Sequence, residues 1–398
     1  MQFASLGNDF QVYFDAGDLI VNFRDPWNST GNPNALYLHG PITSSWIWIF
    51  SLFPYSVSLT ILRILTLALI PLILWMILDL LDIQLHRKIN LWNLSTFALM
   101  SFPIRSILNY GRFEVLIFFL FILIVYLLKK KPKVNLVLVI CGLIMGVIID
   151  YKPQIFLLPC LILLWHYPKI RLILGSLISV IFGSFVSVIL TAEFPYWTWF
   201  NMLHLRSRDT SIEKPLGLFS IYYGFGLSPL LSVAVGFILI SLILLRLHKG
   251  FVPNKIQSTV MFFFVYLFFY PLLHAQDLVW IPLILVTLLA ADNSLIASRF
   301  FWIVSGLVLT WSNNYFLDAI ILISISIWVL FNFSSIPLEK RAILIFLFAL
   351  PSFIFHLTAH FFPTPADGNL RHILVLCDYF LTVGLLVRHI VALKKPLG

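Results

Sequence analysis

The charged residues of this chain are few, and they fall between long apolar runs in clusters of two alternating kinds. In clusters of the first kind every charged residue is Lys or Arg, as at residues 129–131, 169–171 and 394–395. Clusters of the second kind mix acids, His, Arg and aromatic residues, as at residues 9–25 and 274–277. Because Lys and Arg gather in the cytoplasmic loops of membrane proteins, the alternation predicts a polytopic membrane protein whose mixed clusters face the opposite side.

The apolar runs are long and numerous enough to be membrane-spanning helices. Of the 398 residues, 60% are hydrophobic and 11% are charged, whereas about a quarter of the residues of a soluble domain are charged. A spanning helix needs about 20 apolar residues, and a backbone in lipid must satisfy its own polar groups. The runs between residues 56 and 393, one of them at 92–107, therefore predict an all-α protein of about a dozen transmembrane helices, multi-pass in the cell membrane.

The alternation of the clusters also divides the chain. Residues 1–43 are polar and fall on the outer, extracytoplasmic face. No apolar run precedes them, so we expect that a first helix is missing from this sequence. Residues 44–291 form the predicted transmembrane core, which begins with a short aromatic stretch typical of an interfacial helix. Residues 292–398 supply the C-terminal transmembrane helices.

The composition argues against several classes of function. The net charge of +9 lies mostly in the predicted cytoplasmic loops, which indicates contact with anionic membrane lipids and not with nucleic acid. The sequence contains no Walker-type phosphate-binding loop, so ATP-driven transport is not indicated. Cys141, Cys160 and Cys377 lie in apolar runs and form no redox motif, and we expect no cofactor.

The first outer loop supplies the first candidate carboxylates. If residues 9–18 form a helix, Asp9 lies near its start, where a carboxylate is favourable, and Asp15 and Asp18 share one side. The alternative is a solvated loop in which Asp9 acts only as a cap.

Five sequence elements occur in an order that resembles a known enzyme family. The first loop contains Asp-Phe-Gln-Val-Tyr-Phe-Asp-Ala-Gly from Asp9, then Asp-Pro-Trp from Asp25 and Tyr-Leu-His-Gly-Pro from Tyr37. The later elements are Asn-Tyr-Gly-Arg-Phe-Glu at 109–114, Asp-Tyr-Lys-Pro at 150–153, His-Leu-Arg-Ser-Arg at 204–208, and the segment 271–280. Together they resemble glycosyltransferase family 87, the mannosyltransferases of the GT-C fold that use polyprenyl-phosphate sugars.

The resemblance implies a reaction and a set of functional residues. The expected reaction transfers a hexose, mannose by family precedent, from a polyprenyl or dolichyl phosphate to a hydroxyl of a lipid- or glycan-linked acceptor, with inversion. Asp9 is implied as the general base that deprotonates this hydroxyl. The residues expected to bind substrate are Tyr13, Asp15, His39, His204, Gln276 and Asp277.

The leaving group of such a reaction is a phosphate, so cations are needed to neutralise its developing charge. The candidates are Lys152, Arg112, Arg206 and Arg208. Lys152 could instead be a snorkelling lysine at a helix end, and the two arginines of the 204–208 loop could contact lipid headgroups. For Glu114, the favourable dipole at a helix N-terminus explains a carboxylate as well as function does.

Two further features concern catalysis. His274 lies between two apolar runs, where ionisable groups are costly and usually functional, so we expect it to be catalytic; the alternative is that a turn between helices needs some polar residue. Some relatives carry Asp-x-Asp in the first loop, whereas the earlier position here is Gly7. A metal held between two carboxylates is therefore not expected.

A transporter or flippase for a lipid-linked saccharide is the rival interpretation, because it would bind the same ligands. Alternating access would require polar residues deep within the helices. In this sequence the deep segments are almost purely apolar and the polar residues gather on one face, which favours an enzyme with an extracytoplasmic active site.

Overall fold

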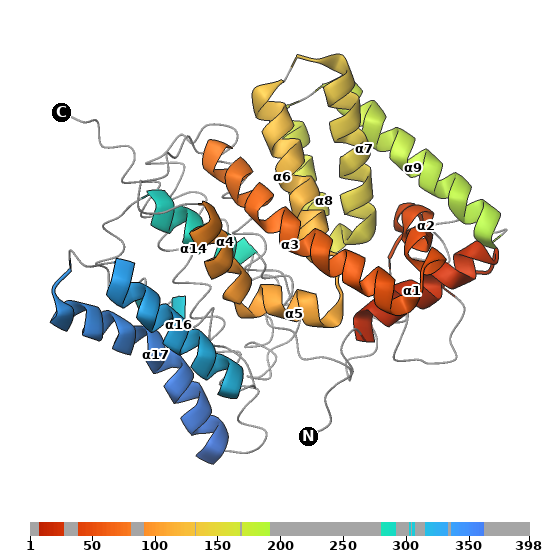
Figure 1. Cartoon of the computed structure of the whole chain (residues 1–398). Helices are drawn as coiled ribbons and strands as arrows, with labels where there is room; N and C mark the ends of the chain where they lie inside the picture. Colours follow the sequence, from red (N-terminus) through yellow and green to blue (C-terminus); the bar gives the residue numbers. More distant parts are fainter. Residues whose placement is uncertain are drawn as a thin grey trace, which may run out of the picture. The chain divides into compact units, whose positions relative to one another are not determined.

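The computed structural model describes residues 8–27, 39–80, 91–131, 133–167, 169–191, 280–291, 302–303, 305–306, 315–332 and 336–361. Over these residues the regular structure is helical and no strand occurs (Figure 1). The predicted all-α class is therefore confirmed.

The helices follow the apolar runs and the polar elements between them. In chain order they are α1 (Asn8–Val21), α2 (Pro41–Ile47), the 3-10 helix η1 (Trp48–Leu52), α3 (Tyr55–Leu80), α4 (Leu91–Met100), α5 (Phe102–Tyr110), α6 (Glu114–Lys130), α7 (Asn135–Tyr151), α8 (Pro153–His166), α9 (Ile170–Thr191), α14 (Trp280–Ala291), α16 (Tyr315–Asn332) and α17 (Leu338–Phe361). The helix expected over residues 9–18 is present as α1. The aromatic stretch expected to be interfacial forms α2 and η1, and its position at a membrane interface stays a prediction.

The described helices give partial support for the predicted spans. By length and composition, the 26-residue α3 alone among them is long and apolar enough to cross a membrane. Shorter apolar helices of 10–17 residues occur within α4, α7, α9 and α16. The predicted number of about a dozen spans is not confirmed.

One apolar run that was predicted to form a single helix forms two. The apolar run at 92–107 is divided into α4 and α5 at Ser101. Pro103 has no backbone N–H to donate to the preceding turn, and in the structure it lies in the first turn of α5, where that bond is not needed. The polar element at 109–114 therefore begins in the last two residues of the nine-residue α5.

The chain divides into two compact units. The first contains α1, α2, η1, the beginning of α3 and the helices α6 to α9; the second contains the rest of α3, α4, most of α5, α14, α16 and α17. In the second unit, α4 packs against α14 and α16 against α17. The candidate site lies entirely within the first unit. The domain limits predicted at residues 43 and 291 stay a prediction.

Small residues hold α7 closely against α9 in the first unit. A Cβ atom added to Gly142 would overlap the carbonyl oxygen of Leu172, and one added to Gly175 would overlap that of Val139. The Ser179 hydroxyl donates a hydrogen bond of 2.8 Å to a carbonyl oxygen of α7. Close approach through small residues and hydroxyl hydrogen bonds is how helices associate where water does not drive packing. This contact fixes α7, whose last turn carries part of the candidate site.

Candidate active site

An ion pair joins α1 to the turn between α5 and α6. Gly111 ends α5 with a φ of 70°, a conformation that favours glycine. A Cβ atom at Gly111 would come within 2.6 Å of Phe10 in α1, so the turn lies directly against that helix. The next residue, Arg112, donates a hydrogen bond from Nε to Oδ2 of Asp9. The Asp9 side chain is 34% exposed and that of Arg112 is 17% exposed.

Two neighbouring carboxylates keep the guanidinium of Arg112 protonated. Burial by itself lowers the pKa of this guanidinium, but the carboxylates of Glu114 and Asp9 raise the pKa by more. Arg112 therefore stays protonated beside α1.

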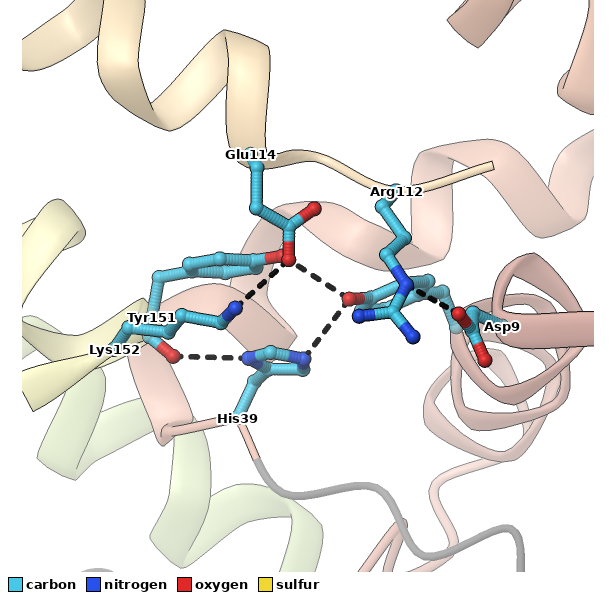
Figure 2. Close-up of polar contacts among 7 residues, drawn as sticks. Asp9, His39, Arg112, Glu114, Tyr151 and Lys152 are labelled. Atoms are coloured by element: carbon cyan, nitrogen blue, oxygen red, sulfur yellow. Dashed lines mark hydrogen bonds and ion pairs between the residues drawn. The ribbon is translucent and has the colours of Figure 1, made fainter. Parts of the chain in front are cut away.

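A second ion pair joins α6 to the junction of α7 and α8. Lys152 lies between the two helices, since Pro153 occupies the first position of α8. Its ammonium nitrogen lies 2.8 Å from Oε1 of Glu114, the first residue of α6. The exposed fractions are 13% for the Lys152 side chain and 6% for that of Glu114. The ammonium thus points into the protein and toward the first ion pair (Figure 2).

Near the two ion pairs, the ring of His39 stacks on that of Tyr151 and also lies close to that of Tyr13. Its ring centroid lies 4.3 Å from that of Tyr151, with an interplanar angle of 10°, and 5.1 Å from that of Tyr13. Nδ1 of His39 is 2.9 Å from the carbonyl oxygen of Tyr151, and Nε2 is 3.1 Å from the Tyr13 hydroxyl. The Tyr13 and Tyr151 hydroxyl oxygens are 3.0 Å apart (Figure 2).

These contacts determine where the protons lie. A carbonyl oxygen can only accept, so His39 carries a proton on Nδ1, and in the neutral ring Nε2 then accepts from Tyr13. The Tyr13 hydroxyl has a single proton, so its oxygen in turn accepts from the Tyr151 hydroxyl. The hydrogen bonds therefore run in one direction, from Tyr151 through Tyr13 to His39.

The structure keeps His39 neutral. Burial, together with the positive charges of Lys152 and Arg112, lowers the pKa of His39 to about 4, although the hydrogen bond to Tyr151 and the charge of Glu114 act in the opposite direction. In the neutral imidazole that donates from Nδ1, Nε2 is left as the acceptor. His39 is thus an uncharged link between the first loop and α7.

We expect the stability of the protein to fall in acid because of His39. The unfolded residue binds a proton below about pH 6.5, whereas the folded one does so only below about pH 4. Between these values the unfolded state binds more protons, so the free energy of unfolding decreases as the pH falls, by about 3 kcal/mol in full. Thermal unfolding of purified protein from pH 7.5 to 4.5 should show this decrease, and His39→Gln should reduce it. Parallel profiles for the two proteins would contradict the neutral assignment.

Hydrogen bonds hold the segment after His39 against the end of α7. Thr43 donates to Oδ2 of Asp150 from its backbone nitrogen, at 2.7 Å, and from its hydroxyl, at 2.9 Å. The backbone nitrogen of Gly40 donates to the carbonyl oxygen of Asp150, and a Cβ atom at Gly40 would overlap the Asp150 carboxylate. Trp27 donates from its indole nitrogen to the carbonyl oxygen of His39. These bonds set the position of His39 and, through Asp150, that of Lys152.

The structure brings together five of the residues expected from the sequence and leaves one apart. Asp9, Tyr13, His39, Arg112 and Lys152 form the cluster. Asp15 lies on the exposed side of α1, where it accepts a hydrogen bond of 2.6 Å from Gln11. The remaining six, namely His204, Arg206, Arg208, His274, Gln276 and Asp277, lie outside the described residues.

Sequence reasoning missed two members of the cluster. For Glu114 the helix dipole and a functional role were left as equal explanations, and Tyr151 was not assigned a role. Both belong to recognised elements, at 109–114 and 150–153. Each stands within two positions of a candidate cation, Arg112 or Lys152, and this proximity could have indicated a role in the site.

The cluster combines two carboxylates, two cations and a neutral hydrogen-bonded stack. A partly exposed carboxylate can accept a proton from a hydroxyl, and Lys and Arg can neutralise a phosphate. Among the described residues, no group of three or more His, Cys, Asp or Glu is placed to hold a metal ion.

Comparison with known proteins identifies one family. The family model of glycosyltransferase family 87 matches residues 37–249, which is more than half of the chain. The matched range contains His39, Arg112, Glu114, Tyr151 and Lys152, and begins after Asp9 and Tyr13. No curated protein and no solved structure matches the chain.

Proposed function

The chain belongs to glycosyltransferase family 87, and we propose that it transfers a hexose, mannose by our expectation, from a polyprenyl or dolichyl phosphate to a hydroxyl of a lipid- or glycan-linked acceptor. A glycosyltransferase acts on a sugar donor and an acceptor, so the site must serve both. The observation that carries the proposal is the pairing of Arg112 and Lys152 with two carboxylates around one neutral stack.

Asp9 is proposed as the general base. Its carboxylate is one-third exposed, so an acceptor can reach it, and the Arg112 contact holds it in one orientation. The acceptor hydroxyl gives its proton to Asp9 while its oxygen forms a bond to C1 of the sugar. The bond from C1 to the phosphate oxygen breaks on the opposite face, and the polyprenyl phosphate leaves with the electron pair. A single base suffices for this one-step inversion.

Arg112 and Lys152 are proposed to receive the charge of the leaving phosphate. Arg112 uses Nε toward Asp9, and a guanidinium has five N–H donors, so others are available to a ligand. When Asp9 takes up a proton, Arg112 loses its counter-charge at the moment when the phosphate gains one. Stabilisation of charge as it develops is what lowers the barrier.

The proposal is tested by following a labelled sugar. Membranes that contain the protein are incubated with radiolabelled polyprenyl-phosphate-mannose, and label is expected in a new lipid or glycan product. Membranes with Asp9→Asn protein serve as the matched control. Label that remains in the donor, for mannose and for other polyprenyl-phosphate hexoses, would contradict the proposed donor.

We propose that the site faces the extracytoplasmic side of a cell membrane, with the chain crossing it many times. The span α3 supports a membrane location. So does α9, which exposes large apolar side chains such as Ile181 (66%) and Phe185 (63%), because exposed apolar patches mark membrane or partner contacts.

Cysteine labelling should reveal this topology. Asp18 in α1 and Lys133 before α7 are both exposed, and the Lys/Arg rule places them on opposite faces. In a Cys377→Ser background, Asp18→Cys should react with an impermeant thiol reagent added to intact cells, and Lys133→Cys should not. Both should react after detergent solubilisation. Equal labelling of the two in intact cells would exclude a site on the outer face.

A further inference from the structure

Among the residues that the structure describes, no group donates a hydrogen bond to one of the two carboxylate oxygens of Glu114. Its side chain is only 6% exposed, and Oε1 is occupied by Lys152 at 2.8 Å. Oε2 is buried and has no hydrogen-bond partner among the residues that the structure describes. In Figure 2 this second oxygen points away from Lys152.

The neighbouring hydroxyls cannot supply the missing donor. Tyr13 gives its single proton to His39, and Tyr151 gives its proton to Tyr13. The direction of this chain is set by the carbonyl oxygen that His39 Nδ1 must bind. Both tyrosines are therefore committed as donors, although they lie beside the carboxylate.

A buried acceptor without a donor is unusual and unfavourable. Most buried polar side-chain atoms in proteins have a partner, and leaving one unpaired weakens the fold. The ion pair with Lys152 needs only one oxygen, so the second is not explained by that pair. A hydroxyl group from a bound substrate would satisfy it.

We propose that Oε2 of Glu114 accepts a hydrogen bond from a hydroxyl of the donor sugar. This inference rests on the proposed function, in which Lys152 holds the donor phosphate. The sugar is bonded directly to that phosphate, so a ligand on Lys152 places the hexose next to Glu114. Glu114 then acts as a specificity residue that orients Lys152 with one oxygen and recognises the sugar with the other.

Binding to purified protein in the absence of acceptor separates these roles. The probes are polyprenyl-phosphate-mannose and polyprenyl phosphate without the sugar. Glu114→Gln should weaken binding of the first by about 10- to 100-fold, as expected for a hydrogen bond to a charged group, and should not weaken binding of the second. Lys152→Gln should weaken binding of both probes. The matched control is Asp18→Asn, which changes an exposed carboxylate of α1 and should leave both affinities unchanged.

Deoxy donors then identify the hydroxyl. Wild-type protein should lose a similar factor of about 10- to 100-fold for one monodeoxy-mannose donor, and Glu114→Gln should lose nothing further on that donor. Glu114→Asp, which keeps the negative charge near Lys152, is a second variant in case Glu114→Gln does not fold, and it should lose the same discrimination.

Three outcomes would overturn the inference. If Glu114→Gln weakens both probes equally, Glu114 is only the counter-ion of Lys152. If it weakens neither but still slows transfer, the hydroxyl belongs to the acceptor and not to the donor. If no monodeoxy donor abolishes the difference between wild type and variant, Oε2 does not contact a sugar hydroxyl. Failure of wild-type protein to bind either probe would instead contradict the proposed donor.

Discussion

Asp9→Asn is expected to lower the rate of sugar transfer by about 10²- to 10⁴-fold, the range for loss of a positioned general base. Asparagine has the same shape as aspartate but cannot take up the proton of the acceptor hydroxyl. Its side-chain oxygen can still accept the hydrogen bond from Arg112, so α1 should keep its contact with the turn before α6. The measurement is the initial rate of label transfer in membranes with matched amounts of protein.

The other acids of α1 are the controls for this result. Asp15 and Asp18 are exposed on the same helix, so Asp15→Asn and Asp18→Asn change the local charge by the same amount. We expect both to retain most of the activity. Near-full activity in Asp9→Asn, together with a large loss in either control, would show that the base is a different carboxylate.

Lys152→Gln is expected to reduce kcat/KM for the donor by about 10- to 100-fold, because a hydrogen bond between charged groups contributes about 1.5–3 kcal/mol. The reason is the loss of the ammonium that we propose to bind the donor phosphate. Lys152→Arg should also be impaired, since a planar guanidinium differs from an ammonium in reach and geometry. Rates measured against donor concentration for both variants test this.

Lys152→Gln is also expected to lower the stability of the protein, because Lys152 forms an ion pair with Glu114. Removing one partner of a buried pair leaves the other uncompensated and costs about 3–5 kcal/mol of stability, so Lys152→Gln should also unfold more easily. The double variant Lys152→Gln/Glu114→Gln should recover much of that stability but none of the donor use. Stability and activity are thereby separated.

Unchanged kinetics in Lys152→Gln would return Lys152 to a purely structural role. The phosphate would then be expected at Arg112 or at the arginines Arg206 and Arg208. A snorkelling lysine places its ammonium in water, whereas the Lys152 side chain is 13% exposed and bound to Glu114. The structure therefore argues against the snorkelling alternative, and the phosphate role stays our proposal.

Local sequence was sufficient to predict several of the helices. The run at 56–83 predicts α3 because an apolar backbone in lipid must pair within its own helix. Pro41 and Pro153 mark the first positions of α2 and α8, where the missing N–H has no cost. The break at Ser101 was missed although Pro103 was visible, because the apolar pattern continues across it and was given more weight.

Local sequence also selected most members of the candidate site. Asp9, Arg112 and Lys152 stand in short polar elements between apolar runs, where ionisable residues are few and therefore informative. Glu114 was harder to assign, because a carboxylate at the start of a helix has a sufficient local explanation.

Only the tertiary structure decided which of these residues meet. Asp9 and Arg112 are 103 positions apart, His39 and Tyr151 are 112 apart, and Glu114 and Lys152 are 38 apart. A helical pattern relates residues three or four positions apart, so it cannot specify such pairs. They depend on the close approach of two glycines to side chains, of Gly111 to Phe10 and of Gly40 to the Asp150 carboxylate. Those contacts also set the proton on His39 and, among the described residues, leave the second oxygen of Glu114 without a donor. Hydrogen-bond direction depends on what each atom faces in space.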